Sequence, residues 1–139
     1  MLEGKKLTSA RKFPALAFIV ALLAIPGAAS ADSRFEPGQY QVREFGPTAH
    51  PHSVAMCISD PAQLLRREHP GIRCTQTVLA QDPMGLTVHY TCAAKGWGRS
   101  TLHFETPRLV QLETQGIANG LPFSYSAELR RTGDCGKSP

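Results

Sequence analysis

The sequence predicts a mainly β domain: an antiparallel meander of six or seven strands, forming a curved sheet or small barrel, with one short covering helix and two disulfides. Three observations support this fold class. Apolar and polar residues alternate through most of the chain after residue 31. Only one segment carries the signals that start a helix. Four cysteines follow residue 31, an even number that is typical of a disulfide framework in a short exported chain.

The first 31 residues have the three parts of a secretory signal peptide. Four basic residues precede an apolar run from Phe13 to Ile25, and the small residues Ala29 and Ala31 follow it. The run is shorter than the roughly 20 residues that a membrane span needs, so cleavage is favoured over anchoring. We expect a cut between Ala31 and Asp32, and a single exported domain, periplasmic or secreted, at residues 32–139.

Removal of this segment changes the charge of the protein. It holds four of the 15 basic residues and one of the 11 acidic ones, so the remaining chain keeps 11 bases and 10 acids. A nucleic-acid or anionic-membrane partner would need a strongly basic face. The expected partner is therefore an envelope protein or a small ligand, with no nucleic acid and no stable membrane anchor.

The four cysteines are Cys57, Cys74, Cys92 and Cys135, and they allow three connectivities. We favour Cys57–Cys74 with Cys92–Cys135, because the first bond would hold both ends of the predicted helix. A structural zinc site is disfavoured, since no two cysteines stand at the short spacing of a zinc knuckle. The sequence predicts no cofactor.

Two strands and the helix are expected in the first half of the domain. Residues Gly38 to Phe45 and Ser53 to Ile58 alternate as strands do. Asp60 is placed to cap a helix, with Pro61 at its first position and Gln63 completing a capping box. A helix of roughly two turns should follow and end at residues 69–71.

Five further strands complete the predicted meander. They are expected at Arg73–Ala80, Leu86–Cys92, Ser100–Thr106, Leu109–Gln115 and Phe123–Arg131. Alternation directs one set of apolar side chains inward, where they either fill the core or line a ligand cavity. This set contains Tyr40, Val42, Leu86, Val88, Tyr90, Leu102, Phe104, Val110, Leu112, Phe123, Tyr125, Ala127 and Leu129.

Histidines offer one candidate metal site. A hairpin symmetric about Gly96 would place His89 opposite His103 on the polar face, with Glu105 two residues further along. Cross-strand neighbours are close enough to share a zinc or copper ion. Solvated side chains on a polar face are the alternative, and we favour it. His50 and His52 form a second pair, which Pro51 is expected to hold in an exposed loop.

Trp97 stands between Gly96 and Gly98 in a predicted connection. It is either a contact residue for a sugar or a peptide, or a lid folded over the sheet. Serine, histidine and aspartate are present, but no Gly-x-Ser-x-Gly elbow is, and the glycines lack the spacing of phosphate-binding loops. No catalytic residue is therefore nominated.

Three short segments carry a resemblance to a known family. They are Pro37-Gly38-Gln39-Tyr40, Cys57-Ile58-Ser59-Asp60-Pro61 and Arg131-Thr132-Gly133-Asp134-Cys135. Together with Cys74 and Cys92 they resemble a bacterial exported family known as domain of unknown function 3617. That family usually has Trp where Tyr40 stands, and one residue fewer before the proline that corresponds to Pro61. The resemblance covers nearly all of residues 32–139. It implies an exported β domain whose cysteines are structural, and it implies no activity.

These features favour a non-catalytic binding or interaction module of the cell envelope. One alternative is a metal-dependent or small hydrolytic enzyme that uses His89 and His103. The other is an inhibitor of a secreted enzyme, which the size and the disulfides would suit.

Overall fold

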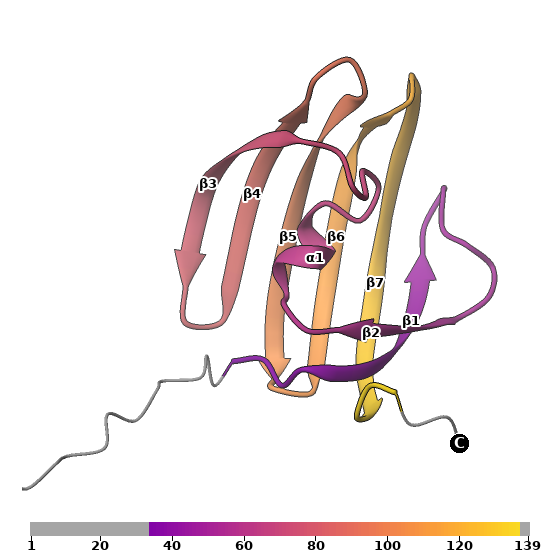
Figure 1. Cartoon of the computed structure of the whole chain (residues 1–139), viewed down its shortest axis with the longest axis vertical. Coiled ribbons are helices and arrows are strands. Elements are labelled where there is room, and N and C mark those ends of the chain that lie inside the picture. The colour runs from indigo at the N-terminus through magenta and orange to yellow at the C-terminus, as the bar shows by residue number, and fades with distance from the viewer. Residues whose placement is uncertain (1–33, 137–139) are drawn as a thin grey trace, which may run out of the picture.

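The computed structural model describes residues 34–136, and the expected signal peptide lies outside them. Seven strands form one antiparallel sheet in the order β2-β1-β7-β6-β5-β4-β3 (Figure 1). The elements are β1 (Gly38–Phe45), β2 (Val54–Ile58), α1 (Ala62–Leu65), β3 (Cys74–Asp82), β4 (Gly85–Cys92), β5 (Gly96–Thr106), β6 (Leu109–Ala118) and β7 (Leu121–Gly133). The predicted meander is confirmed, and the sheet is open rather than closed into a barrel.

The helix α1 covers one face of the sheet, called here the inner face (Figure 1). Alternation places the expected apolar set on this face, where it packs as one core together with Leu64 and Leu65 of α1. Three of its largest members, Tyr40, Tyr90 and Leu102, are at most 1% exposed. The inward-facing residues therefore form the packed core, which was one of the two roles expected for them.

The helix is shorter than predicted. The Asp60 carboxylate accepts a hydrogen bond from the Ala62 amide at 2.8 Å, and the Gln63 side chain accepts one from the Ser59 amide at 3.1 Å. The N-cap residue is Pro61 and not Asp60, and Gln63 bonds to Ser59 ahead of the helix, so the expected capping box does not form. Asp60 still pairs the Ala62 amide, which the helix start leaves unpaired. The helix ends after Leu65 because Arg66 leaves the helical region of backbone space, so one turn forms instead of two.

The favoured disulfide pairing is wrong. The bonds are Cys57–Cys135 and Cys74–Cys92. Gln39 of β1 pairs with Cys57 of β2 on one side and with Gly133 of β7 on the other, so the sheet order carries Cys57 to the chain end beyond β7. Cys74 and Cys92 are direct cross-strand partners. Strand order and register decide both bonds. The favoured pairing was based instead on the positions of Cys57 and Cys74 before and after the helix.

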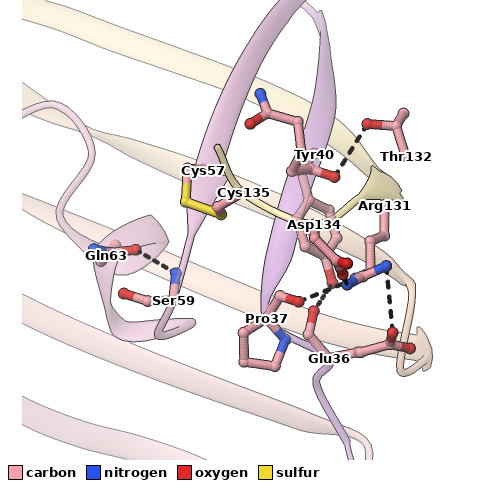
Figure 2. The surroundings of a disulfide bond; sticks show 11 residues. Glu36, Pro37, Tyr40, Cys57, Ser59, Gln63, Arg131, Thr132, Asp134 and Cys135 are labelled. Atoms are coloured by element: carbon pink, nitrogen blue, oxygen red, sulfur yellow. Dashed lines mark hydrogen bonds and ion pairs between the residues drawn. A yellow bond between two sulfur atoms is a disulfide. The ribbon is translucent and has the colours of Figure 1, made fainter. Parts of the chain in front are cut away.

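Arg131 holds the end of β7 against the start of β1 (Figure 2). Its guanidinium donates to the Pro37 carbonyl at 3.0 Å and to the Asp134 carboxylate at 2.7 Å, and forms an ion pair with Glu36 at 3.3 Å. A Cβ on Gly38 would lie 2.4 Å from the Gly133 carbonyl oxygen, so only glycine fits this crossing. The first and last segments of the family resemblance thus meet in one structural joint beside the Cys57–Cys135 bond.

Candidate functional site

His89 and His103 do not lie together. Cys92 pairs with Gly96, so the turn contains only residues 93–95, and Ala94 takes a positive φ of 57°. The expected register, symmetric about Gly96, is therefore wrong, and His89 lies opposite Arg99. His103 pairs with Gly85, four residues from His89, which corresponds to about 13 Å along the strand.

The other residues named for metal binding are also apart. Glu105 is exposed near the end of β5, where the β5–β6 register shifts. Within residues 34–136, no group of three or more histidine, cysteine, aspartate or glutamate residues is placed to hold a metal ion. His50 contacts Glu44 at 2.8 Å, and His52 is exposed. The candidate zinc or copper site thus has no geometric support.

Trp97 lies within β5 rather than in a connection. Its ring stacks on the His89 ring, with centroids 5.7 Å apart and planes 26° apart, and the residue is 40% exposed. Both residues lie on the face opposite α1, called here the outer face, in line with Thr91, Arg99 and other polar positions. The structure therefore places two of the four candidate contact residues side by side on an exposed surface.

A hollow of about 360 Å³ adjoins this pair on the outer face. Two rows of registered cross-strand partners form its floor, one running Arg99–Gln115–Ser124 and the other Thr101–Glu113–Ser126. The last residue of β1, Phe45, and the loop that follows, at Gly46 and Pro47, form one wall. Arg99 directly opposes His89, so the aromatic pair lies beside the hollow, although neither ring lines it.

The loop that walls the hollow is attached to β7. The Thr48 hydroxyl donates to the Ser124 carbonyl at 3.1 Å and accepts from the Ser124 amide at 2.9 Å. Gly46 has a positive φ of 121°, and a Cβ there would lie 3.2 Å from Tyr125 Cα. Glycine at this position lets the chain turn over the edge of β7. The wall is therefore a fixed part of the sheet and not a loose loop.

The polar groups of the hollow are available to a ligand. Arg99, Glu113, Gln115 and Ser126 are exposed, and none of their side chains forms a hydrogen bond or ion pair within the described part of the chain. Neighbouring polar residues outside the hollow do pair, as Glu128 and Arg130 do at 3.3 Å. A cation, an anion, an amide and hydroxyls thus converge on one concave surface with their hydrogen-bonding capacity unused.

A second polar cluster lies on the inner face, and its side chains form hydrogen bonds and ion pairs with one another. Glu44 of β1 forms an ion pair with Arg67 and accepts two hydrogen bonds from His50, through its amide and its ring, each at 2.8 Å. The Tyr125 hydroxyl donates to Glu68 at 2.6 Å, and the Arg67 guanidinium lies 5.8 Å from the Tyr125 ring centre. The cluster links the loop after β1, the segment after α1, and β7.

Sequence reasoning missed this cluster, although a signal for it existed. Glu44 continues the inward-facing positions of Tyr40 and Val42, and its side chain is only 2% exposed. A carboxylate at a core-facing position needs charged or hydrogen-bonding partners. The position of Glu44 in the alternation therefore predicts that this carboxylate has polar partners. Which residues these are, Arg67 and His50, depends on the path of the chain.

Substitution of Glu44 should change how stability depends on pH. Burial alone raises the pKa of Glu44, but the hydrogen bonds from His50 and the charge of Arg67 outweigh it, so the pKa lies below its ordinary value of 4.5. Ionised Glu44 thus stabilises the fold above pH 4.5, and this contribution is lost as pH falls through the lowered pKa. We expect Glu44→Gln to lower the free energy of unfolding by about 1–3 kcal/mol at pH 7. The difference from wild type should shrink below pH 4.5 in urea titrations.

Glu128→Gln is the matched control for this measurement, because Glu128 pairs with Arg130 on the surface. Exposed pairs contribute about 0–1 kcal/mol. Two results would contradict a stabilising role for ionised Glu44. One is an equal loss of unfolding free energy in both variants, and the other is a Glu44→Gln effect that does not vary with pH.

Two core tyrosines stay neutral. Burial raises the pKa of Tyr90 to about 12. Burial, followed by the hydrogen bond that Tyr125 donates to Glu68, also raises the pKa of Tyr125. Neither hydroxyl is suited to act as a base near pH 7, because the ideal pKa of a catalytic base lies near the working pH.

His69 is the one buried histidine of the described residues and is 2% exposed. The Tyr90 hydroxyl lies 3.1 Å from its Nδ1, and its Nε2 lies 3.1 Å from the Ile117 carbonyl and 3.2 Å from that of Lys95. Two carbonyl partners require a proton on Nε2, and in that tautomer of the neutral ring Nδ1 accepts from the Tyr90 hydroxyl. His69 thus attaches the segment after α1 to the sheet and has no free nitrogen for a ligand.

The structure is a disulfide-linked, open-sheet β domain with an exposed polar hollow on its outer face. Comparison of the chain with models of protein families, with curated proteins and with solved structures found no match. Two disulfides fit an extracellular or otherwise oxidising compartment. Within residues 34–136, no helix has the length and hydropathy needed to cross a membrane.

Proposed function

We propose that this protein is a non-catalytic binding module of the bacterial cell envelope and that the outer-face hollow is its binding site. The observation that carries this proposal is the convergence of Arg99, Glu113 and Gln115 on a concave surface, with no partners inside the described chain. The inner-face polar cluster and His69 offer no such free groups. Export through a cleaved signal peptide, and membership of the resembled family, are parts of the same proposal.

The chemistry of the hollow favours a neutral ligand rich in hydroxyl groups, such as a glycan of the envelope. One cation and one anion line it, at Arg99 and Glu113, so neither sign of ligand charge is favoured. A guanidinium donates hydrogen bonds, a carboxylate accepts them and an amide does both, so these groups complement hydroxyls, which donate and accept. The adjoining Trp97 ring supplies an apolar surface, as an aromatic residue does at many binding sites. The volume is at the small end of the range for ligand sites, about 300–1,000 Å³.

Titration of the disulfide-intact protein with soluble peptidoglycan fragments and neutral oligosaccharides, followed by isothermal calorimetry and amide NMR shifts, tests this proposal. Shifts should centre on β5, β6 and β7 around the hollow. Arg99→Ala should weaken binding by about 10-fold or more, because a hydrogen bond to a charged group contributes about 1.5–3 kcal/mol.

Arg130→Ala is the matched control, since Arg130 is an exposed arginine of the outer face outside the hollow. Binding that is equally weakened by both variants would reflect general charge loss. Shifts confined to the α1 side of the sheet would place the site elsewhere, and the absence of binding to any tested glycan would refute the proposed ligand class.

A further inference from the structure

The edge strand β3 is the most exposed strand of the sheet. It pairs only with β4, and every residue from Thr75 to Asp82 is exposed. Val78 and Leu79 are 52% and 50% exposed, which is high for branched apolar residues in a strand. A nine-residue strand at a sheet edge offers a row of unpaired backbone groups to another strand.

The Cys74–Cys92 bond identifies which backbone groups of β3 face outward. The Cα atoms of this cross-strand pair are 4.1 Å apart. In antiparallel sheets, pairs without mutual hydrogen bonds have Cα atoms about 4.5 Å apart, and hydrogen-bonded pairs about 5.5 Å. Cys74 therefore belongs to a non-hydrogen-bonded pair. By alternation, the amide and carbonyl groups of Cys74, Gln76 and Val78 point away from β4, toward the free edge.

The first half of this edge, from Cys74 to Val78, lacks the usual protection against pairing. Between Cys74 and Gln81, β3 contains no charged residue and no proline. Its irregularity, between Val78 and Ala80, leaves the segment from Cys74 to Val78 regular. The opposite edge, β2, is only five residues long and is tied to the chain end through Cys57. Natural edge strands are protected by short length, charge, proline or a bulge, and the first half of β3 has none of these.

We propose that two copies of this protein associate edge to edge through antiparallel β3 strands, forming one continuous sheet. The register that fits the outward groups pairs Gln76 of one copy with Val78 of its partner, and the reverse. Each such pair exchanges two backbone hydrogen bonds across a two-fold axis at Thr77.

The charges at the two ends of β3 support the same register. Arg73 immediately precedes the strand and Asp82 ends it, and an antiparallel arrangement about Thr77 brings Arg73 of each copy near Asp82 of the other. Because the two ends of β3 carry opposite charges, they favour antiparallel pairing with the β3 strand of a second copy. Within each copy, the Cys74–Cys92 bond keeps β3 attached to β4.

Sedimentation equilibrium of the disulfide-intact protein over a range of concentrations tests this proposal. Wild type should show a concentration-dependent dimer. Gln76→Pro removes an outward amide that β4 does not use, so the fold should persist while the dimer constant weakens at least 10-fold. Val78→Lys places a charge at the edge and should act likewise, and Arg73→Glu should weaken the dimer by bringing two acids together.

Val54→Lys is the matched control, because Val54 is a 46% exposed valine on the opposite edge strand. It should leave the dimer constant unchanged, and circular dichroism should show that each variant is folded. If Gln76→Pro unfolds the chain, Val78→Lys decides the test alone. A monomer at the highest soluble concentration, a dimer that survives Val78→Lys, or a dimer broken by Val54→Lys would overturn the proposal.

Discussion

Replacing Cys57 and Cys135 together with alanine is expected to lower the free energy of unfolding by about 4.5 kcal/mol. The bond joins residues 78 apart in sequence, and in the chain-entropy model a closed loop of that length restricts the unfolded chain by this amount. Both residues are exposed, so the substitutions remove little packing in the folded state. Urea denaturation followed by circular dichroism should show the loss.

A crossed variant distinguishes the two disulfide pairings. Cys57→Ala with Cys74→Ala breaks both bonds of the structure, but only one bond if Cys57 were joined to Cys74. The second bond, with a separation of 18 residues, contributes about 3 kcal/mol more. The summed loss is comparable to the total stability of a small domain, about 5–15 kcal/mol. The crossed variant should therefore be far less stable than Cys57→Ala with Cys135→Ala, and equal stability of the two would contradict the structure.

Gly96→Ala is expected to lower the free energy of unfolding by about 2–6 kcal/mol. Gly96 has a positive φ of 123°, where a residue with a Cβ is strained by about 1–3 kcal/mol. Its Cβ would also lie 1.8 Å from the Ile117 carbonyl oxygen, which accepts a hydrogen bond from His69. Moving that carbonyl would leave a buried polar group without its partner, at a further cost of about 1–3 kcal/mol. Thermal and urea unfolding both measure the effect.

Variants at two other glycines distinguish the backbone strain at Gly96 from the contact with the Ile117 carbonyl. Gly120 has a positive φ of 80° with open space around it, so Gly120→Ala should show backbone strain alone. Gly133 lies outside the positive-φ region and also faces open space, so Gly133→Ala should change stability little. The expected order of loss is Gly96, then Gly120, then Gly133. Similar losses at Gly96 and Gly120 would show that the Ile117 contact is unimportant.

The candidate site was only partly predictable from the sequence. Alternation assigned His89 to the polar face, and Trp97 was named as an aromatic residue between two glycines. Both belong to the exposed surface. Arg99, Glu113 and Gln115 were not singled out, because each is an ordinary polar residue of an outward-facing position. They line one hollow only because β5 and β6 align them beside one another and the loop at Gly46 adds a wall.

A shift in one turn accounts for the rejected histidine pair. The hairpin between β4 and β5 turns at residues 93–95, whereas the glycines at 96 and 98 suggested a later turn. Gly98 instead lies within β5, where a Cβ would fall 2.3 Å from the Tyr90 hydroxyl oxygen, so it makes room for a core side chain. Glycine signals a turn and a close approach equally well, and only packing distinguishes them.

The sequence alone determined the mainly β class, the position of every strand to within a few residues, the inward-facing core and the presence of two disulfides. These properties follow from local alternation, turn residues and composition. The tertiary structure alone decided the open sheet, the pairing of β1 with β7, the Cys57–Cys135 and Cys74–Cys92 bonds, and the hollow around Arg99. Strand order and register link residues far apart in the chain, and many registers satisfy the same alternation. The physical selection among them comes from packing the whole core at once.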